Sequence, residues 1–161
     1  RSAEGEDFDP ASVRIEDALA CTLDVRTYNG FAFWLAGSDD GARRLRWTRL
    51  DGANPLLLEY RLPAAIEAFG QRTDRVAFTS NAVVVLLPGA DAAALGKRLG
   101  VENMLPAAGR FLGERIVART AETDDALGMR FTYVTALSVS TVASHPGMTL
   151  AGCSYRVEEG E

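Results

Sequence analysis

The chain contains two cysteines, Cys21 near its start and Cys153 near its end. In a reducing cytosol such a pair is typical of two unrelated buried thiols, whereas in an oxidising compartment it is typical of one disulfide. A bridge would close a long loop, for which the chain-entropy model gives about 5 kcal/mol of stabilisation. We predict this bridge, and therefore a fold that brings both ends of the domain together.

Length and composition limit the chain to one ordinary globular domain. It has 161 residues, of which 47% are hydrophobic and 24% are charged, and these values fit a single packed core and exclude wholesale disorder. The net charge of −5 disfavours binding to nucleic acid or to an anionic membrane surface. The longest apolar run, at residues 82–87, is far shorter than the roughly 20 residues of a transmembrane helix.

We expect three segments along the chain. Residues 1–12 are polar and acidic and form a flexible lead-in, residues 13–157 form the single globular domain, and residues 158–161 form a frayed acidic tail. The chain begins at Arg1 and not at a methionine, which removal of a signal peptide would explain. We therefore expect a periplasmic or secreted protein, and a lipid anchor upstream of Arg1 is one form of this expectation.

Capping residues and apolar spacing predict two or three short helices. They are expected over residues 13–22, 27–37 and 92–99. Asp9, Thr27 and Asp91 are the expected N-terminal caps, and Gly100 is expected to end the last helix. Gly30 lies inside the second segment, where glycine costs about 1 kcal/mol, so a strand remains the alternative there.

Alternation of apolar and polar residues predicts strands over most of the remaining chain. They are expected at residues 44–50, 56–62, 75–79, 82–87, 109–119, 129–139 and 149–157. Residues 82–87 should form a central strand, residues 121–128 a polar loop, and the strand at 129–139 should be bulged or broken near Ala136. Because only one short helix interrupts these strands, we predict an α+β domain with a mainly antiparallel sheet of about five to seven strands.

The sequence lacks the motifs of the common enzyme classes. It contains no glycine-rich phosphate-binding loop and no G-x-S-x-G nucleophile elbow. His145 is the only histidine, which excludes a histidine-rich metal site, and neither zinc nor calcium spacing is found. We therefore expect no metal, no cofactor and no catalytic residue, so enzyme activity is not favoured.

Two catalytic arrangements remain as minor alternatives. Cys153 could act as a nucleophile with His145 as its base, but a disulfide at Cys153 would remove that thiol. Ser144 or Ser154 with His145 and an aspartate would form a triad, which is an arrangement that any chain with one histidine offers.

A basic cluster and an aromatic cluster are the candidate binding surfaces. Arg44 and Arg46 would share one face of the strand at 44–50 and could receive an anionic ligand or an acidic partner; the alternative is a solvated edge strand protected by charge. Phe33 lies off the main aromatic stripe and is expected to be exposed. The aromatic residues that recur at helical spacing are expected in the core: Tyr28, Phe31 and Trp34.

Residues 145–155, with the sequence HPGMTLAGCSY, resemble the C-terminal part of small uncharacterised exported proteins of GC-rich Gram-negative bacteria. The segment opens with His145, Pro146 and Gly147, which suit a type II turn. Residues 69–73 and 113–115 are similar to the same group. The resemblance covers most of the chain after residue 15 and implies export without a particular activity. Some small exported proteins of this kind are immunity proteins, encoded beside an effector that acts in the periplasm.

These observations favour a non-catalytic periplasmic binding protein, in one form the immunity or inhibitor partner of a secreted effector. The expected partner is another protein and not nucleic acid, and the oligomeric state is left open. A small hydrolase or small-ligand binder is the second hypothesis, and a pocket lined by arginine, tyrosine and a buried carboxylate would favour it. A structural envelope component or lipoprotein domain is the third.

Overall fold

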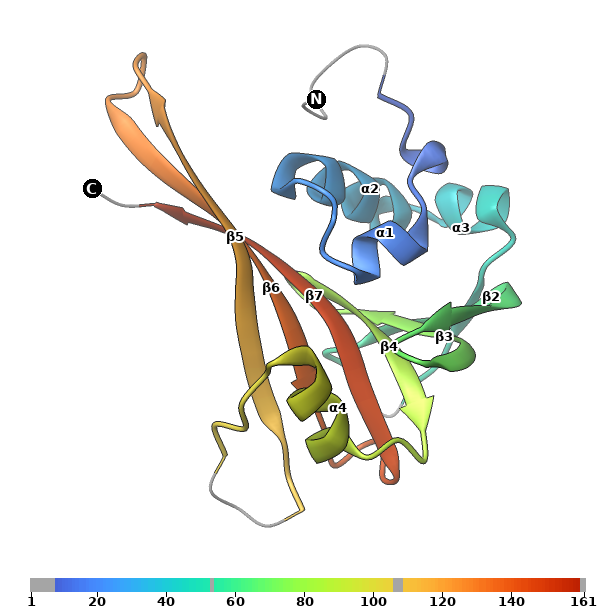
Figure 1. Ribbon diagram of the computed structural model, residues 1–161. Coiled ribbons are helices and arrows are strands. Elements are labelled where there is room, and N and C mark those ends of the chain that lie inside the picture. The colour runs from blue at the N-terminus through green and yellow to red at the C-terminus, as the bar shows by residue number, and fades with distance from the viewer. Residues whose placement is uncertain (1–7, 53, 106–108, 160–161) are drawn as a thin grey trace.

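The computed structural model describes residues 8–52, 54–105 and 109–159, and it shows an α+β fold (Figure 1). The helices in the described residues are the short 3-10 helix η1 (Pro10–Ser12), α1 (Ile15–Leu19), α2 (Val25–Gly37), α3 (Asp39–Leu45) and α4 (Ala92–Leu99). The strands are β1 (Thr48–Leu50), β2 (Leu58–Ala68), β3 (Gln71–Phe78), β4 (Ala82–Pro88), β5 (Leu112–Asp124), β6 (Met129–Ser140) and β7 (Met148–Glu159). None of the described helices is long and apolar enough to cross a membrane.

The strands form one antiparallel sheet in the order β1-β2-β3-β4-β7-β6-β5. This confirms the predicted fold class. Residues 82–87 of β4 are all buried, and β4 occupies the middle of the sheet, as their apolar character predicts. β7 follows β6 in the chain but inserts between β4 and β6, so it joins the two halves of the sheet.

The helices cover one face of the sheet (Figure 1). The main core cluster combines residues of α1 and α2 with the inward residues of the strands and with α4. Tyr28 of α2 stacks on Tyr155 of β7 with ring centroids 4.0 Å apart. The Tyr155 hydroxyl donates a hydrogen bond of 2.6 Å to the Ala18 carbonyl oxygen, so the last strand is fixed to both early helices.

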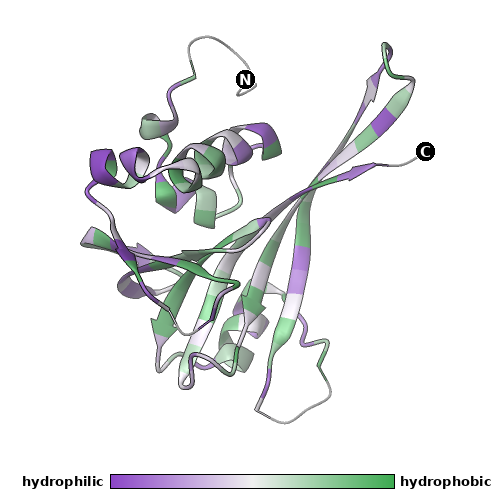
Figure 2. Ribbon diagram, turned by 180° about the vertical axis from the view of Figure 1, so that it is seen from behind, coloured by the Kyte–Doolittle hydropathy of each residue, from purple (hydrophilic) through white to green (hydrophobic). Residues whose placement is uncertain are grey.

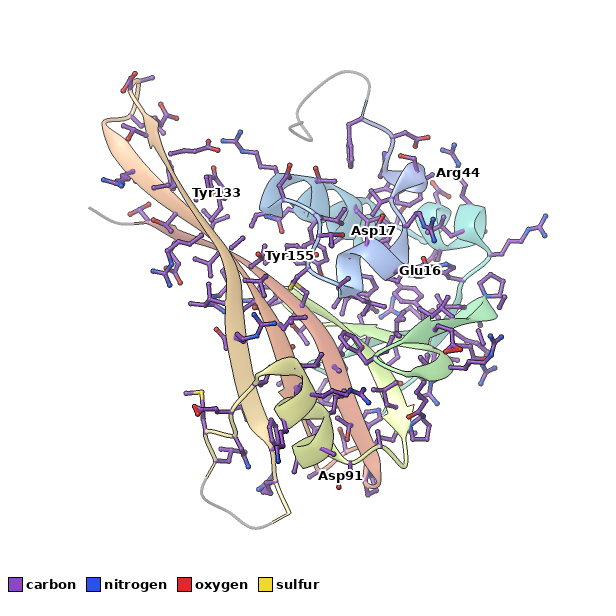
Figure 3. All side chains as sticks on the ribbon, viewed as in Figure 1. Glu16, Asp17, Arg44, Asp91, Tyr133 and Tyr155 are labelled. Carbon is purple, nitrogen blue, oxygen red and sulfur yellow. A yellow bond between two sulfur atoms is a disulfide. The ribbon has the colours of Figure 1, made fainter. Side chains whose placement is uncertain are left out.

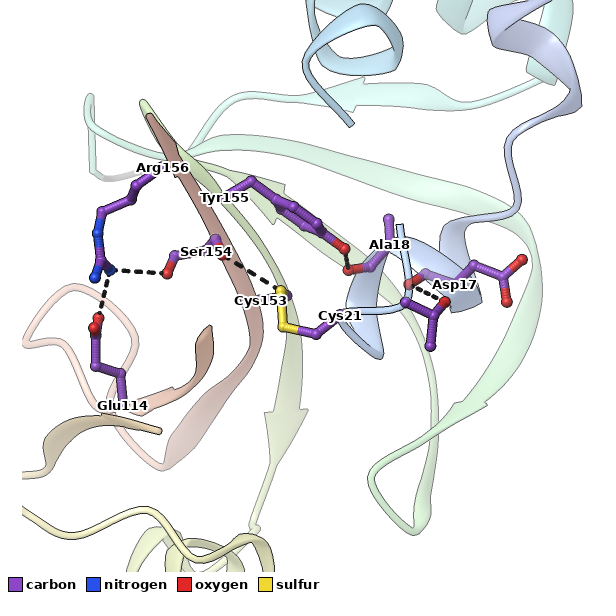
Figure 4. Close-up of a disulfide and its surroundings, with 9 residues drawn as sticks. Asp17, Ala18, Cys21, Glu114, Cys153, Ser154, Tyr155 and Arg156 are labelled. Carbon is purple, nitrogen blue, oxygen red and sulfur yellow. Dashed lines mark hydrogen bonds and ion pairs between the residues drawn. A yellow bond between two sulfur atoms is a disulfide. The ribbon is translucent and has the colours of Figure 1, made fainter. Parts of the chain in front are cut away.

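The predicted disulfide between Cys21 and Cys153 is present, with the two Cα atoms 5.3 Å apart (Figure 4). Cys21 lies two residues after α1 in a left-handed conformation with φ of 65°. Cys153 is fully buried on β7. The bond therefore joins the end of the first helix to a central strand, and a disulfide of this kind is consistent with an oxidising, extracytoplasmic location.

The helix predicted at residues 13–22 is wrong in extent. Asp9 does act as a cap, but of η1, where its side chain accepts a hydrogen bond from the Ala11 amide. The backbone then turns extended at Val13, which separates η1 from the five residues of α1. α2 begins earlier than expected, because Asp24 and not Thr27 is its cap: the Asp24 carboxylate accepts from the Thr27 amide at 2.7 Å.

The strand predicted at residues 44–50 is also wrong over its first half. Ser38 caps a third helix, α3, and Asp39 and Asp40 in its first turn favour helix formation. Arg44 lies in the last turn of α3, and Arg46 ends the helix in a left-handed conformation. The two arginines therefore do not share a strand face, and only Thr48–Leu50 pair with β2.

The first half of the polar loop predicted at residues 121–128 is strand, because β5 continues to Asp124 and pairs with β6 along its whole length, and residues 125–128 form the turn between them. The expected irregularity near Ala136 exists, but it lies on the opposite strand: the register of β5 shifts between Ile116 and Ala118. We call residues 118–124 of β5 and 129–135 of β6 the arm. The arm projects past the helices, and hydrophilic and hydrophobic residues alternate along it (Figure 2).

Smaller differences concern a proline and the two ends. β2 continues through Pro63 to Ala68, beyond the end of the strand predicted at residues 56–62, and its pairing with β3 shifts register between Arg61 and Ile66. Residues 1–7 of the expected lead-in and residues 160–161 of the expected tail lie outside the described residues. Residues 158–159 belong to β7.

Candidate functional site

A groove of about 410 Å³ lies between the arm and the connection from α1 to α2. One wall is the connection itself: Cys21, Thr22, Leu23, Asp24, Val25 and Arg26. The other wall is the helix-facing side of the arm: Ala118, Thr120, Glu122, Tyr133 and Thr135. We call this hollow the groove.

A second hollow of about 340 Å³ continues the groove toward the tip of the arm. It shares Arg26, Glu122 and Tyr133 with the groove. Its further lining residues are Thr123, Asp124, Asp125 and Phe131. We call it the outer end of the groove.

Strand register explains why these side chains gather on one side. Cross-strand partners point to the same face of a sheet. Thr135 lies between Ala118 and Tyr155 in one row, and Tyr155 belongs to the buried core. The groove is therefore the continuation of the core face of the sheet beyond the point where helices cover it.

Arg26, in the first turn of α2, bridges the two walls. Its guanidinium donates hydrogen bonds of 2.8 Å to Glu122 Oε1 and 3.0 Å to the Tyr133 hydroxyl. The guanidinium carbon lies 5.2 Å from the centre of the Tyr133 ring, in a cation–π arrangement. Figure 3 shows Tyr133 on the side of the arm that faces α2.

The Thr135 hydroxyl is an unsatisfied group in the wall of the groove. Thr135 is only 4% exposed. Within the described part of the chain, its Oγ1 and the Nε of Arg75 are the two buried side-chain atoms without a hydrogen-bond partner. Leaving such a hydroxyl unpaired costs about 1–3 kcal/mol.

The disulfide fixes one wall of the groove. Cys21 lines the groove, and its partner Cys153 lies in the sheet beneath. The burial of Tyr155 raises the pKa of its phenol above the ordinary value. A wall that is already held in place loses little conformational entropy when a partner binds.

A second cluster of polar side chains lies on the other face of the sheet; we call it the Glu59 cluster. Glu59 Oε1 accepts a hydrogen bond of 2.7 Å from Arg75, and Glu59 Oε2 lies 2.8 Å from His145 Nε2. His145 Nδ1 lies 2.8 Å from Ser144 Oγ, which accepts at 3.3 Å from Asn54 Nδ2. His145 Nε2 faces the Glu59 carboxylate and donates to it, while His145 Nδ1 faces the Ser144 hydroxyl.

Glu59 carries its charge although it is 1% exposed. Burial alone would raise its pKa, but hydrogen bonds and charge from Arg75 and His145 outweigh burial, so the pKa of Glu59 is lowered. The cluster ties the β1–β2 loop and the β6–β7 loop to the sheet. A side chain at Gly52 would collide with the Glu59 carboxylate, which shows how closely the first loop packs on it.

Ser144, His145 and Glu59 have the residue types of a catalytic triad, and Ser144 is only partly buried. A cleft of about 970 Å³ lies beside the cluster, and its described lining includes His145 but not Ser144. The Ser144 hydroxyl is engaged by both Asn54 and His145. The arrangement therefore serves to hold loops together better than to present a nucleophile. Sequence reasoning missed this cluster because Glu59 lies 86 residues from His145.

The structure places the predicted site residues as follows. Cys153 is oxidised in the disulfide, so its proposed role as a nucleophile with His145 is excluded. The turn at His145, Pro146 and Gly147 is present: the Met148 amide donates to the His145 carbonyl at 3.2 Å, and Gly147 has φ of 76°.

The predicted surface residues are exposed but separate. Phe33 is 81% exposed on α2, as predicted. Arg44 lies on α3, 3.9 Å from the Asp9 carboxylate, and Arg46 follows α3. None of these three residues lines the groove. The alternation of apolar residues at 129–139 was the one sequence signal near the groove, because it placed Tyr133 on the apolar side of its strand.

No group of histidine, cysteine and carboxylate side chains in the described residues could hold a metal ion. The chain matches no protein family, no curated protein and no solved structure.

Proposed function

We propose that this chain is a non-catalytic binding protein of an oxidising compartment, most simply the periplasm, and that another protein occupies the groove. The observation that carries the proposal is an open groove beside the disulfide, lined by Arg26 and Tyr133 and bordered by the exposed strand β5.

The shape of the site favours a protein over a small molecule. β5 is the edge strand of the sheet, and its residues between Glu114 and Thr123 are all exposed. A partner can therefore contact the groove and the strand beside it together. Arginine and tyrosine, here Arg26 and Tyr133, are the residue types that dominate binding energy at protein interfaces. In its more specific form, the proposal is an immunity or inhibitor role toward a secreted effector. The expected compartment and the small size of this chain support that form.

A small-ligand binder remains the second candidate, because 410 Å³ lies within the usual range of ligand pockets. The groove has the arginine and the tyrosine that this hypothesis requires. Its carboxylate, Glu122, is 47% exposed rather than buried. The required combination is therefore only partly met.

Photocrosslinking from two neighbouring positions on β5 tests the proposal. A photoreactive phenylalanine analogue at Thr120 would face the groove, and the same group at Ala121 would face the opposite side of the sheet. In the native host we expect one discrete protein adduct from position 120 and none from position 121. No adduct at either position, or the same adducts at both, would overturn the proposal.

A further inference from the structure

We propose that the partner docks by strand addition: an extended segment of the partner pairs with the arm part of β5, residues 118–124, as one more strand of the sheet. This inference rests on the proposed function, because it names the part of the partner that lies beside the groove and the bonds that hold it. The chemistry recognised is the backbone of an extended polypeptide.

β5 leaves one edge of the sheet open. Among the described strands it pairs only with β6, and its residues from Glu114 to Thr123 are exposed. In an antiparallel pair, residues whose backbone groups face the neighbouring strand alternate with residues whose N–H and C=O face away. Every second residue of the arm part of β5 therefore directs a donor and an acceptor to the open side. The opposite edge strand, β1, has only three residues, so β5 is the longer docking edge.

The chain itself shows how this edge takes up a segment. At the start of β5, the Met104 amide donates a hydrogen bond of 2.8 Å to the Leu112 carbonyl. The Leu112 amide donates to Asn103 Oδ1 at 3.1 Å. Both backbone groups of Leu112 thus point away from β6 and are covered by the segment that precedes β5. From Glu114 to Thr123, no backbone group bonds to the backbone of another described segment outside the pairing with β6.

The β-bulge separates the covered start of the edge from the arm. The register of β5 against β6 shifts between Ile116 and Ala118, after which the two strands pair without interruption to Asp124. Bulges protect edge strands because they interrupt the regular row of backbone groups. This bulge lies before the arm, so it sets the inner limit of the docking edge and leaves residues 118–124 regular.

Charge beside the open edge favours an acidic residue in the added strand. Arg119 faces the side of the sheet opposite the groove, in one row with Val134 and Arg156. Arg156 is bonded to Glu114, whereas the Arg119 side chain has no ion pair or hydrogen bond with another described residue. Opposite charges on cross-strand neighbours attract, so an acidic side chain opposite Arg119 would supply the charge partner that the fold leaves out.

The groove side of the same edge favours an apolar residue. Thr120 faces the groove in one row with Tyr133 and Val157. Val157 is 47% exposed although it is apolar. Aromatic and β-branched side chains pair favourably across strands, so valine or isoleucine opposite Thr120 would extend this row. The added strand therefore alternates between a β-branched residue on the groove side and an acidic residue on the other side.

Titration of the purified protein with a short peptide tests strand addition. The probe is acetyl-TTTVET-amide, whose antiparallel pairing places valine opposite Thr120 and glutamate opposite Arg119. We expect the amide NMR signals of residues 118–124 to shift. N-methyl groups on one alternate set of peptide amides should abolish binding, and N-methyl groups on the other set should leave it intact, because only one edge of the peptide pairs with β5. Loss with both sets, loss with neither, or no shift at all would overturn the inference.

Two arginines, one on each edge strand, provide a matched pair of variants. Arg119 on β5 and Arg49 on β1 are both exposed. Arg119→Glu should weaken binding of the TTTVET peptide about threefold or more and should favour acetyl-TTTVKT-amide, whereas Arg49→Glu should change binding of either peptide by less than about twofold. Equal changes in both variants would mean a response to net charge alone and would overturn the inference.

The remaining outcomes separate this inference from its alternatives. If analytical ultracentrifugation shows a dimer whose amides at residues 118–124 are already protected from exchange, a second copy occupies the edge and the inference is wrong. If position 120 crosslinks a partner but the peptide does not pair with residues 118–124, strand addition is wrong and the binding function stands. If the peptide pairs with β5 but no partner crosslinks at position 120, the edge accepts a strand and the proposed function is wrong.

Discussion

The Glu59 cluster and the groove each contain a glutamate bonded to an arginine at nearly the same distance, 2.7 Å for Glu59–Arg75 and 2.8 Å for Glu122–Arg26. They differ in burial: Glu59 is 1% exposed and Glu122 is 47% exposed. A buried carboxylate depends on its partners, whereas an exposed one can exchange them for water or for a ligand. The comparison teaches that burial, and not the length of the bond, separates the ion pair that holds this fold together from the ion pair that is open to a partner.

Replacing each glutamate in turn tests most directly whether burial separates the two ion pairs. Glu59→Ala leaves Arg75 and His145 without their shared anion and should lower the free energy of unfolding by about 3–5 kcal/mol. Glu122→Ala removes an exposed pair and should cost less than about 1 kcal/mol. Urea unfolding of both variants measures the difference, and similar costs at the two sites would show that burial does not decide the role of the pair.

Removing the disulfide should weaken the fold and the groove together. The double variant Cys21→Ala with Cys153→Ala should lose about 2–5 kcal/mol of stability. Because Cys21 lines the groove, crosslinking from position 120 should weaken as well, under conditions where circular dichroism shows the protein still folded. The NMR signal of the His145 ring should be unchanged in the folded variant, since the Glu59 cluster lies on the other face of the sheet. Unchanged crosslinking would show that the bond does not organise the groove.

Acid should weaken the Glu59 cluster selectively. The folded-state pKa of Glu59 is lowered from its ordinary value of 4.5, so its contribution is fully present above that value and is lost as the pH falls through the folded pKa. The stability gap between the wild type and Glu59→Gln should therefore narrow as the pH falls below about 4. Urea unfolding at acidic pH measures the gap; a gap that already narrows above about pH 5 would contradict the lowered pKa.

The smallest effect is expected at Phe33, a surface residue that the sequence singled out and that lies outside the groove. Phe33→Ser should change the free energy of unfolding by less than about 0.5 kcal/mol and leave crosslinking from position 120 unchanged. A loss of the crosslinked adduct would extend the binding surface from the groove onto α2.

Local signals in the sequence predicted those elements that depend on neighbouring residues. Asp91 and Gly100 define α4 as expected, and the apolar residues 82–87 form the central strand. The disulfide was predictable because it follows from two cysteines in an oxidising compartment, without knowledge of the fold. Errors arose where two local signals competed, as at Arg44, where the alternation of residues 44–50 suggested a strand but the Ser38 cap starts a helix.

The site itself could not be predicted, because it depends on contacts between distant segments. Arg26 meets Tyr133 across 107 residues, and Glu59 meets His145 across 86. Neither arginine nor glutamate stands out in a chain with 17 basic and 22 acidic residues. The groove also needs β5 to continue to Asp124, and composition alone predicts a loop there because an exposed edge strand is as polar as a loop.

The position of β7 has a consequence for the order in which this protein assembles. β7 is the last strand along the described chain, yet it lies between β4 and β6. Before β7 is synthesised, the strands can pair only as two separate groups, β1–β4 and β5–β6. The core of the nascent chain is then incomplete. Sheets that require such distant pairings fold slowly. Native pairing of Cys21 with Cys153 therefore has to wait until β7 has been synthesised, and the bond then holds the strand that joins the two halves of the sheet to the end of the first helix.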